Sequence, residues 1–217
     1  MHHPDIGRRL VDALMDRYYD FLLDVVFLGR YGLFLRRAVK LMEFRPGDWV
    51  LDMGSGTGRI ALLVLEQVGL KGGIIGVDAS PAMVAQFRRK CDRFPNTSVL
   101  LARIDRPLPY RGEFDKVLFS FVLHELPREP RDRALDNASL ALKENGELLV
   151  LDYNTFSNGV PWGIKLFFRL IEPPHILDFV KQDLKEALSR KGFGDFMEYH
   201  LVRGYVRLLK ARKVWSS

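Results

Sequence analysis

Cysteine is almost absent from this 217-residue chain, which contains Cys91 alone. A single thiol can form neither an internal disulfide nor a cysteine-based zinc site, and this usage is typical of a reducing compartment. Long apolar runs are also missing, since no stretch approaches the roughly 20 apolar residues that cross a bilayer. The first residues lack the apolar run and small-residue cleavage site of a signal peptide. We therefore expect a cytoplasmic protein without an integral membrane segment.

Internal repeats and low-complexity tracts are absent as well, so the length predicts one globular domain. The net charge of +6 does not come from one basic run, because lysine and arginine are spread along the chain. The densest acid-free basic stretch lies at 203–213, where alternation predicts the solvent face of a strand. No RNA-reading signature accompanies it. We expect neither a nucleic-acid partner nor a metal ion.

The most informative stretch that is present is a glycine turn, in which an apolar strand ends in Asp52 and three glycines precede a helix. Gly54, Gly56 and Gly58 permit positive φ and a close approach to a ligand, and the first N–H groups of the helix point back at it. A dinucleotide fingerprint, G-x-G-x-x-G, would have its third glycine at Arg59. The observed G-x-G-x-G spacing behind an acid favours a ligand that presents an amine over one that presents a pyrophosphate.

Beyond this turn, strands and helices alternate, which predicts a parallel sheet with right-handed crossovers. An acid ends the second expected strand 20 residues after Gly58, where a carboxylate can accept both hydroxyls of a ribose. Ligands of such sheets bind outside the carboxyl ends of the strands. The expected strand ends carry Asp52, Asp78, Asp105, Ser120 and Tyr153. Their common position is stronger evidence for a site than any one motif.

The sequence of the C-terminal part predicts an antiparallel hairpin in place of the alternating strands and helices. A helix is expected from about Leu177 to Arg190, and strands at about 196–202 and 205–211 are joined as a hairpin. The fold class is therefore α/β: a Rossmann-like, doubly wound, mostly parallel sheet of seven strands that ends in an antiparallel hairpin. We expect residues 1–44 to form an N-terminal helical cap of the same domain. Residues 45–217 would form the core, with a lid insertion at about 156–175.

With its motifs in this order, the chain resembles the class I S-adenosylmethionine-dependent methyltransferases from about Arg45 to Lys213. The acid and G-x-G-x-G pattern of that family appears as Asp52 to Gly58, its ribose-binding acid as Asp78 and its adenine-side acid as Asp105. The resemblance implies S-adenosylmethionine as cofactor and S-adenosylhomocysteine as product. The residues that it implies for cofactor binding are Asp52, Gly54, Ser55, Gly56, Gly58, Asp78, Ala79, Met83, Ile104, Asp105, Ser120 and Phe121.

Two subfamilies are similar to the chain in further parts. The Tyr19-Asp20 pair, an arginine-rich helix and Arg45-Pro46-Gly47-Asp48 resemble the front end of the ubiquinone/menaquinone biosynthesis C-methyltransferases. Those enzymes continue the fourth strand with an Arg-Asn pair, where this chain has His124-Glu125. Bacterial phospholipid N-methyltransferases share the core, the size and an apolar N-terminal helix. The resemblance thus implies either a quinone precursor or a lipid headgroup as acceptor.

Two apolar segments, 18–35 and 161–171, flank the expected site and predict a small lipophilic acceptor. They can instead enclose a small substrate or form the face of a homodimer. The first segment can also lie on the inner face of a membrane as an amphipathic helix. Asp16, Asp20 and Asp24 argue against this contact, because they would line one helical face and repel anionic lipid.

The candidate catalytic residues are His124 and Tyr19. His124 follows the fourth strand and can serve as general base for a phenol or an activated carbon, or else cap the next helix or bond Glu125. Tyr19 can close over the cofactor or substrate, although aromatic residues in an apolar helix more often only pack. Asp152 and Tyr153 can orient a polar headgroup. No strong base is obligatory, because alignment of the reactants alone can contribute about 7–11 kcal/mol.

Two functions of other classes stay open at this point. A non-catalytic binding protein on the same fold would normally have lost the glycines or the ribose acid, and here both are intact. An NAD-dependent oxidoreductase is disfavoured by Arg59 at the third fingerprint position and by the lack of a second catalytic domain.

Overall fold

The structure is a computed structural model that describes residues 30–154 and 176–214. Its elements are α2 (Tyr31–Leu41), β1 (Trp49–Met53), α3 (Arg59–Val68), β2 (Gly73–Asp78), α4 (Pro81–Cys91), β3 (Thr97–Leu101), β4 (Phe114–Ser120), the 3-10 turn η1 (Leu123–Glu125), α5 (Arg128–Ala141), β5 (Leu142–Tyr153), α7 (Ile176–Phe179), α8 (Leu184–Ser189), β6 (Phe193–Leu201), η2 (Val202–Gly204) and β7 (Val206–Lys213).

The described strands form one seven-stranded sheet in the order β3-β2-β1-β4-β5-β7-β6. The pairs β1–β2, β2–β3, β1–β4 and β4–β5 are parallel, and β7 pairs antiparallel with both β5 and β6. β7 is therefore the one strand of the seven that runs against the others. The expected α/β class, with a mostly parallel sheet and a terminal antiparallel hairpin, is confirmed.

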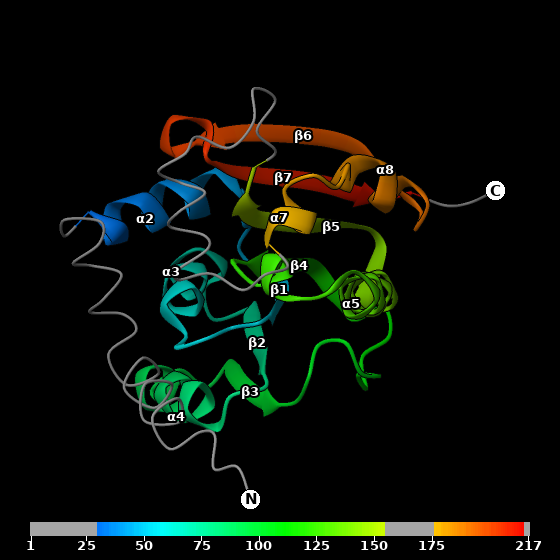
Figure 1. Cartoon of the computed structure of the whole chain (residues 1–217). Coiled ribbons are helices and arrows are strands. Elements are labelled where there is room, and N and C mark those ends of the chain that lie inside the picture. Colours follow the sequence, from blue (N-terminus) through cyan, green and yellow to red (C-terminus); the bar gives the residue numbers. More distant parts are fainter. Residues whose placement is uncertain (1–29, 155–175, 215–217) are drawn as a thin grey trace, which may run out of the picture.

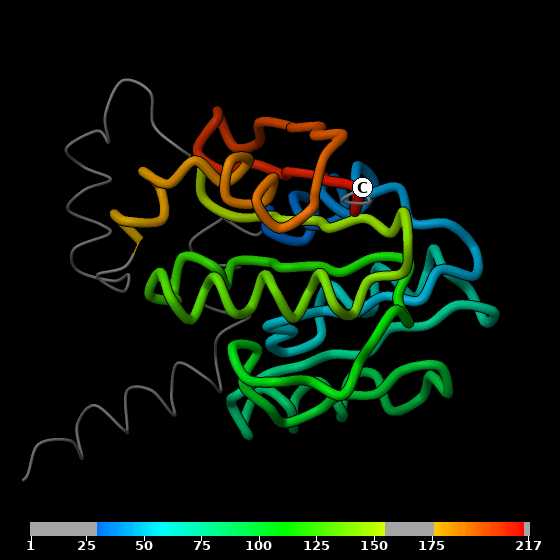
Figure 2. Tube along the Cα trace, turned by 90° about the vertical axis from the view of Figure 1, so that its right-hand side faces the viewer, coloured from blue at the N-terminus to red at the C-terminus, as the bar shows by residue number. Residues whose placement is uncertain are grey.

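Helices cover both faces of this sheet (Figure 1). The helices α2, α3 and α4 lie on one face, while α5, α7 and α8 lie on the other, which Figure 2 shows from the front. Side chains alternate along each strand, so Leu148 and Val150 of β5 join the core under α5, and Leu149 and Leu151 join the core under α3. Both faces of the sheet are thus buried, so a ligand can reach the sheet only at the ends of its strands.

Local sequence signals set the ends of the helices beside the glycine turn. Gly58 precedes α3 in the left-handed region, at φ 79°. At α4, the Ser80 Oγ accepts a hydrogen bond from the Met83 N–H and Pro81 occupies the first helical position. The first of these boundaries agrees with the helix expected after the glycine turn.

The single helix expected from Leu177 to Arg190 is wrong. The chain forms two short helices there, α7 and α8, because the Asp183 side chain accepts a hydrogen bond from the Glu186 N–H and starts a new helix. The break lets the Phe179 side chain stay fully buried in the core beneath α5.

The basic stretch at the end of the chain does not form a solvent face. Arg207 and Lys210 of β7 are only 4% and 5% exposed. Lys210 forms an ion pair with Glu43, and the Arg207 guanidinium lies 5.7 Å from the centre of the Phe179 ring. A solvent face is missing because β7 is an inner strand between β5 and β6, and both of its faces are buried over residues 206–211.

The described part of the expected N-terminal cap is α2. Leu35, Ala38 and Val39 are buried in the same core as α3. Residues 1–29 and 155–175, which include Tyr19 and the whole of the expected lid, lie outside the described residues, so those expectations remain predictions. Among the helices of the described ranges, none is both long enough and apolar enough to span a bilayer.

Candidate cofactor and acceptor site

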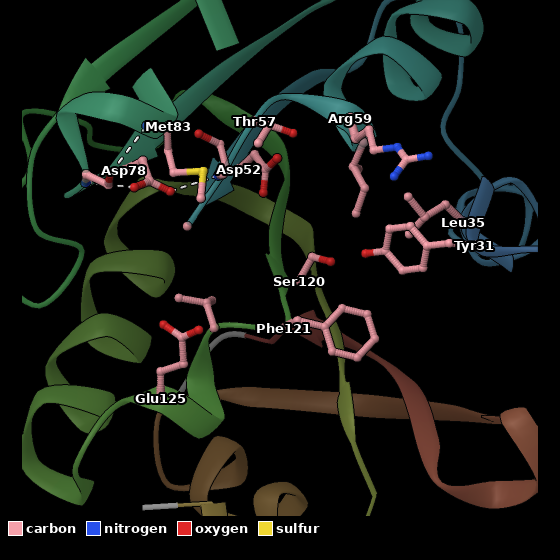
Figure 3. A pocket seen from close by; sticks show the side chains of 16 residues that line it. Tyr31, Leu35, Asp52, Thr57, Arg59, Asp78, Met83, Ser120, Phe121 and Glu125 are labelled. Atoms are coloured by element: carbon pink, nitrogen blue, oxygen red, sulfur yellow. Dashed lines mark hydrogen bonds between the residues drawn. The ribbon is translucent and has the colours of Figure 1, made fainter. Parts of the chain in front are cut away.

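A pocket of about 330 Å³ opens at the carboxyl ends of β1, β2 and β4. Its walls come from the glycine turn after β1, from the end of β2 with the start of α4, from the end of β4 with η1, and from α2. In Figure 3, Asp78 and Met83 lie at one end, Tyr31 and Leu35 at the other, and Phe121 and Glu125 along a third side. The pocket therefore occupies the place where ligands of such sheets bind.

Asp78 holds the glycine turn in place. Its Oδ2 accepts a hydrogen bond from the Gly56 N–H at 2.8 Å, and its Oδ1 accepts one from the Ser80 N–H at 2.9 Å. One carboxylate at the end of β2 thus joins the turn after β1 to the start of α4. It also brings a negative charge to the wall of the pocket.

Asp52 is a buried carboxyl group with an unused oxygen. Its side chain lies in the pocket wall, it is 1% exposed, and its Oδ1 has no hydrogen-bond partner. Burial, reinforced by the charge of Asp78, raises the pKa of Asp52 to about 7. A buried acceptor without a donor is costly. A ligand that presents a cationic amine here would supply the missing donor and the missing charge.

Gly54 allows the turn to lie against the end of β4. Its φ is +87°, and a Cβ built on it would lie 2.6 Å from Cγ2 of Val122. Val122 itself lines the pocket. A side chain at this position would therefore strain the backbone and push on the wall.

An aromatic cluster, formed by Tyr31, Phe34, Phe121 and Tyr153, extends from α2 to the end of β5. The Phe121 ring centre lies 6.1 Å from that of Phe34 and 5.9 Å from that of Tyr153, and the rings of Tyr31 and Phe34 are stacked at 6.0 Å. Phe121 has a positive φ of 50°, an uncommon conformation for a bulky residue. Tyr31 and Phe121 bring this apolar surface to the pocket (Figure 3).

His124 lies behind the pocket wall, between neighbours that form it. Val122 and Glu125 line the pocket, whereas His124 is 3% exposed and its Nδ1 lies 2.7 Å from Oδ1 of Asp152. The Nδ1 partner is thus Asp152 rather than Glu125, and α5 begins after Pro127 without a side-chain cap. Asp152 is fully buried, so it does not present its carboxylate to a headgroup as the sequence suggested.

Most of the predicted cofactor residues come together at the pocket. The structure places Asp52, Gly54, Ser55, Gly56, Asp78, Met83, Ser120 and Phe121 in its wall. Gly58 stands at the start of α3 behind the turn, and Ala79 is exposed beside Asp78. Their roles in binding remain predictions.

Asp105 and Ile104 are not brought to the wall. Ile104 is buried in the core under α5. Asp105 is 3% exposed and accepts hydrogen bonds from Nε and one terminal nitrogen of Arg103, at 2.9 and 3.0 Å. The Arg103 guanidinium holds the pKa of Asp105 below its ordinary value. Contact of Asp105 with an adenine would require the Arg103 side chain to share this carboxylate.

Several residues of the wall were not predicted from the sequence. They are Tyr31, Leu35, Thr57, Arg59, Ile60, Ser80, Val122 and Glu125. Proximity to the glycine turn was a signal for Thr57 and Arg59, and Tyr31 and Leu35 belong to the apolar segment 18–35 that was expected to flank the site. No group of three His, Cys, Asp or Glu side chains that could hold a metal ion is found within residues 30–154 and 176–214.

Comparison with known proteins identifies the class. Residues 50–146 match the family described as a methyltransferase domain. The fold is similar to the crystal structure of an S-adenosylmethionine-dependent methyltransferase from Aquifex aeolicus, with a TM-score of 0.67 and 22% identity over 86% of this chain and 93% of that one. The chain therefore contains a methyltransferase domain and has the fold of S-adenosylmethionine-dependent methyltransferases, which implies S-adenosylmethionine as the cofactor. The resemblance inferred from the motifs is confirmed.

Within the class, the chain is similar to quinone-pathway relatives. It is 32% identical to the ubiquinone/menaquinone biosynthesis C-methyltransferase UbiE of Methylococcus capsulatus over 155 residues, which are 70% of this chain. It is 29% identical to the demethylmenaquinone methyltransferase of Symbiobacterium thermophilum over 171 residues, or 76% of this chain. These matches span 61% and 66% of the two relatives, respectively.

Proposed function

We propose that this protein transfers a methyl group from S-adenosylmethionine to a small lipophilic acceptor, and that the acceptor is a quinone precursor. One observation carries the cofactor half of the proposal: the unpartnered Oδ1 of Asp52 lies in the wall of a pocket at the carboxyl ends of the strands. The names of the similar relatives support the acceptor half.

The residues present fit the cofactor. Asp52 would accept a hydrogen bond from the ammonium group of the methionine part. Asp78 would accept hydrogen bonds from the ribose hydroxyls while it also holds the glycine turn. Met83 and Phe121 offer apolar surface on opposite sides of the pocket (Figure 3). When bound, S-adenosylmethionine supplies an electrophilic methyl group on a sulfonium sulfur. The protein contributes binding, orientation and a dry pocket.

The aromatic cluster supports a flat, apolar acceptor. Aromatic rings interact with Phe121 or Tyr31 through stacked or edge-on contacts that contribute about 0.5–1.5 kcal/mol beyond their buried area. Methylation of a ring carbon also requires that the acceptor lose a proton. His124 is the proposed proton acceptor: it lies behind the pocket wall, in a chain segment whose residues Val122 and Glu125 line the pocket. Tyr19 and the segment 156–175 are proposed to close over the acceptor.

A transfer assay with methyl-labelled S-adenosylmethionine tests this function. Label should enter a reduced demethylmenaquinone analogue, and the Asp78→Asn variant should lose this activity together with affinity for S-adenosylhomocysteine. Transfer to phosphatidylethanolamine vesicles alone would replace the quinone precursor with a lipid headgroup. Tight binding of S-adenosylhomocysteine without transfer to either acceptor would favour a non-catalytic binding protein.

A further inference from the structure

A buried polar cluster lies behind the pocket, under α5. It consists of Asp152 at the end of β5, His124 in η1 and Arg131 on α5, whose exposures are 0%, 3% and 0%. Burial of three ionisable side chains is costly unless their hydrogen bonds are satisfied. The arrangement of those bonds shows what the cluster does.

Asp152 binds the backbone N–H groups of the histidine and of the residue before it. Its Oδ2 accepts hydrogen bonds from the N–H groups of Leu123 and His124, at 3.1 and 3.3 Å. Its Oδ1 accepts one from the Tyr153 N–H at 2.8 Å and faces the His124 Nδ1 at 2.7 Å. A carboxylate offers only acceptors, so the imidazole nitrogen that faces it carries a proton. In the neutral ring the other nitrogen, Nε2, is then the one with a lone pair.

Arg131 holds the same turn from the opposite side. Its Nε donates to the carbonyl of Leu123 at 3.0 Å, and a terminal nitrogen donates to the carbonyl of Leu126 at 2.8 Å. The guanidinium also lies 5.0 Å from the centre of the Phe179 ring. A rigid fork of donors thus spans the two carbonyls that flank His124-Glu125.

We infer that Asp152 and Arg131 are positioning residues for His124. Asp152 fixes the proton on Nδ1 and so keeps Nε2 as the nitrogen that can take the proton lost by the acceptor, while Arg131 holds the backbone of η1 at the wall of the pocket. This inference rests on the proposed function, in which the acceptor forms a bond to the methyl carbon and loses a proton. The cluster therefore contains a carboxylate–histidine pair in which the carboxylate fixes the tautomer of the imidazole.

Other charged side chains lie around the cluster. Arg207 of β7 is paired in register with Asp152 of β5 and lies over the same Phe179 ring as Arg131. Asp178 of α7 lies 3.3 Å from a terminal nitrogen of Arg131, and Glu198 of β6 lies 4.0 Å from Arg207. The mutations below leave Arg207, Asp178 and Glu198 unchanged.

The Asp152→Asn variant tests the tautomer. In either orientation of the new amide, its NH₂ group faces N–H groups that donate to the Asp152 carboxylate in the wild type. The imidazole of His124 can move its proton from Nδ1 to Nε2, whereas a backbone N–H cannot lose its proton. The NH₂ group should therefore face Nδ1 and shift the proton to Nε2. ¹⁵N NMR of labelled histidine, with His124→Gln for assignment, should show the proton on Nδ1 in the wild type and on Nε2 in the variant. This measurement needs no acceptor.

The same variant tests the consequence for catalysis. With Nε2 protonated, kcat should fall about 100-fold or more, the range typical of a general base, while the affinity for S-adenosylhomocysteine changes less than about twofold. A wild-type histidine with its proton on Nε2, or a variant that keeps kcat within twofold, would overturn the role of Asp152. A wild type that methylates no acceptor would remove the proposed function, whereas the NMR result would still decide the tautomer.

Arg131→Met tests the second positioning residue, with Lys116→Met as the matched control. Lys116 is also a buried cation, 5% exposed, but it pairs with Glu147 near the start of β4, away from the pocket. Both variants should lower the melting temperature, and only Arg131→Met should lower kcat and weaken the Nδ1 proton signal. Equal losses of kcat in the two variants would mean that Arg131 acts only through stability.

Discussion

At the scale of single residues, the most consequential group is Asp52. A carboxyl with a pKa of about 7 is only partly ionised in the neutral pH range, and it lies beside a second carboxylate that disfavours its charge. An ammonium group bound against it would reverse this effect, because opposite charges favour the ionised form. Binding of the cofactor and the ionisation of Asp52 are therefore linked.

The Asp52→Asn variant makes this link measurable. Since only the ionised form should bind the amine well, the affinity of the wild type for S-adenosylhomocysteine should fall about tenfold between pH 8 and pH 6. The variant should bind weakly at pH 8 and show little pH dependence. Titration calorimetry at the two pH values measures both. Parallel pH profiles for the two proteins would exclude Asp52 as the amine partner.

The same residue affects stability, with a sign set by its raised pKa. A raised carboxyl pKa contributes stability that is fully present below the unfolded value of 3.8 and is lost as the pH rises through about 7. Asp52→Asn removes this loss. Its melting temperature relative to the wild type should thus be higher at pH 8 than at pH 5, as measured by thermal denaturation without ligand.

Gly54→Ala should close the pocket. The new Cβ would meet Val122 at 2.6 Å, and the φ of +87° is strained for alanine. We expect a loss of stability and at least about a tenfold loss of cofactor affinity. The control is Gly47→Ala, at φ +95° with nothing within 4 Å of its Cβ. If the two variants bind the cofactor with equal affinity, backbone strain alone explains the effect of Gly54→Ala, and the contact with Val122 plays no part.

The residues of the site were predictable where a local spacing encodes them. Asp52, the glycines and Asp78 follow from one strand–turn–helix–strand unit, so their convergence could be expected. The pairing of His124 with Asp152 could not, because it depends on the register that sets Ser120 opposite Leu151. Asp105 also follows a strand end, yet Arg103 two residues earlier takes its carboxylate.

At the scale of elements, α4 shows how a helix end serves the site. Its Ser80 contributes two separate groups: an Oγ that caps the helix and an N–H that donates to Asp78. The Oγ cap stabilises the helix, whereas the N–H holds the Asp78 carboxylate. A substitution of the Ser80 side chain removes the first group and keeps the second.

Ser80→Ala should lower the free energy of unfolding by about 1 kcal/mol, the usual value of such a cap. That loss corresponds to about 2–4 °C in melting temperature for a chain of this size. The affinity for S-adenosylhomocysteine should change little, because the N–H remains. A large loss of affinity with unchanged stability would mean instead that the hydroxyl contacts the cofactor.

The elements themselves were predicted well where the apolar pattern is periodic. The strands β1, β2, β4 and β5 end at the residues expected from the sequence or next to them. The failures have two causes: Asp183 divides the expected final helix, and Glu43 and Phe179 pair with the buried Lys210 and Arg207. Such partners come from distant parts of the chain, so alternation alone cannot reveal them.

At the scale of the whole molecule, the described sheet carries candidate cofactor residues at its strand ends, whereas the acceptor half of the proposal depends on a segment outside the described residues. The core matches the methyltransferase domain over residues 50–146, whereas the apolar segment 161–171 lies outside the described residues. Its composition is what predicts a lipophilic acceptor.

Trp162→Ser combined with Phe167→Ser tests that part of the proposal. The double variant should lose binding of a quinone analogue and keep its affinity for S-adenosylhomocysteine, because the cofactor residues lie on the core. Fluorescence titration with the two ligands measures this directly. Loss of both affinities together would indicate a role in folding.

The central claim, that the glycine turn with Asp52 and Asp78 binds S-adenosylmethionine, is tested most directly by thermal denaturation with S-adenosylhomocysteine and, in parallel, with NAD. At 100 times its Kd, S-adenosylhomocysteine should add about 2.7 kcal/mol of stability, or about 5–11 °C in melting temperature, and NAD should add none. Stabilisation by NAD, with no effect of S-adenosylhomocysteine, would contradict the account.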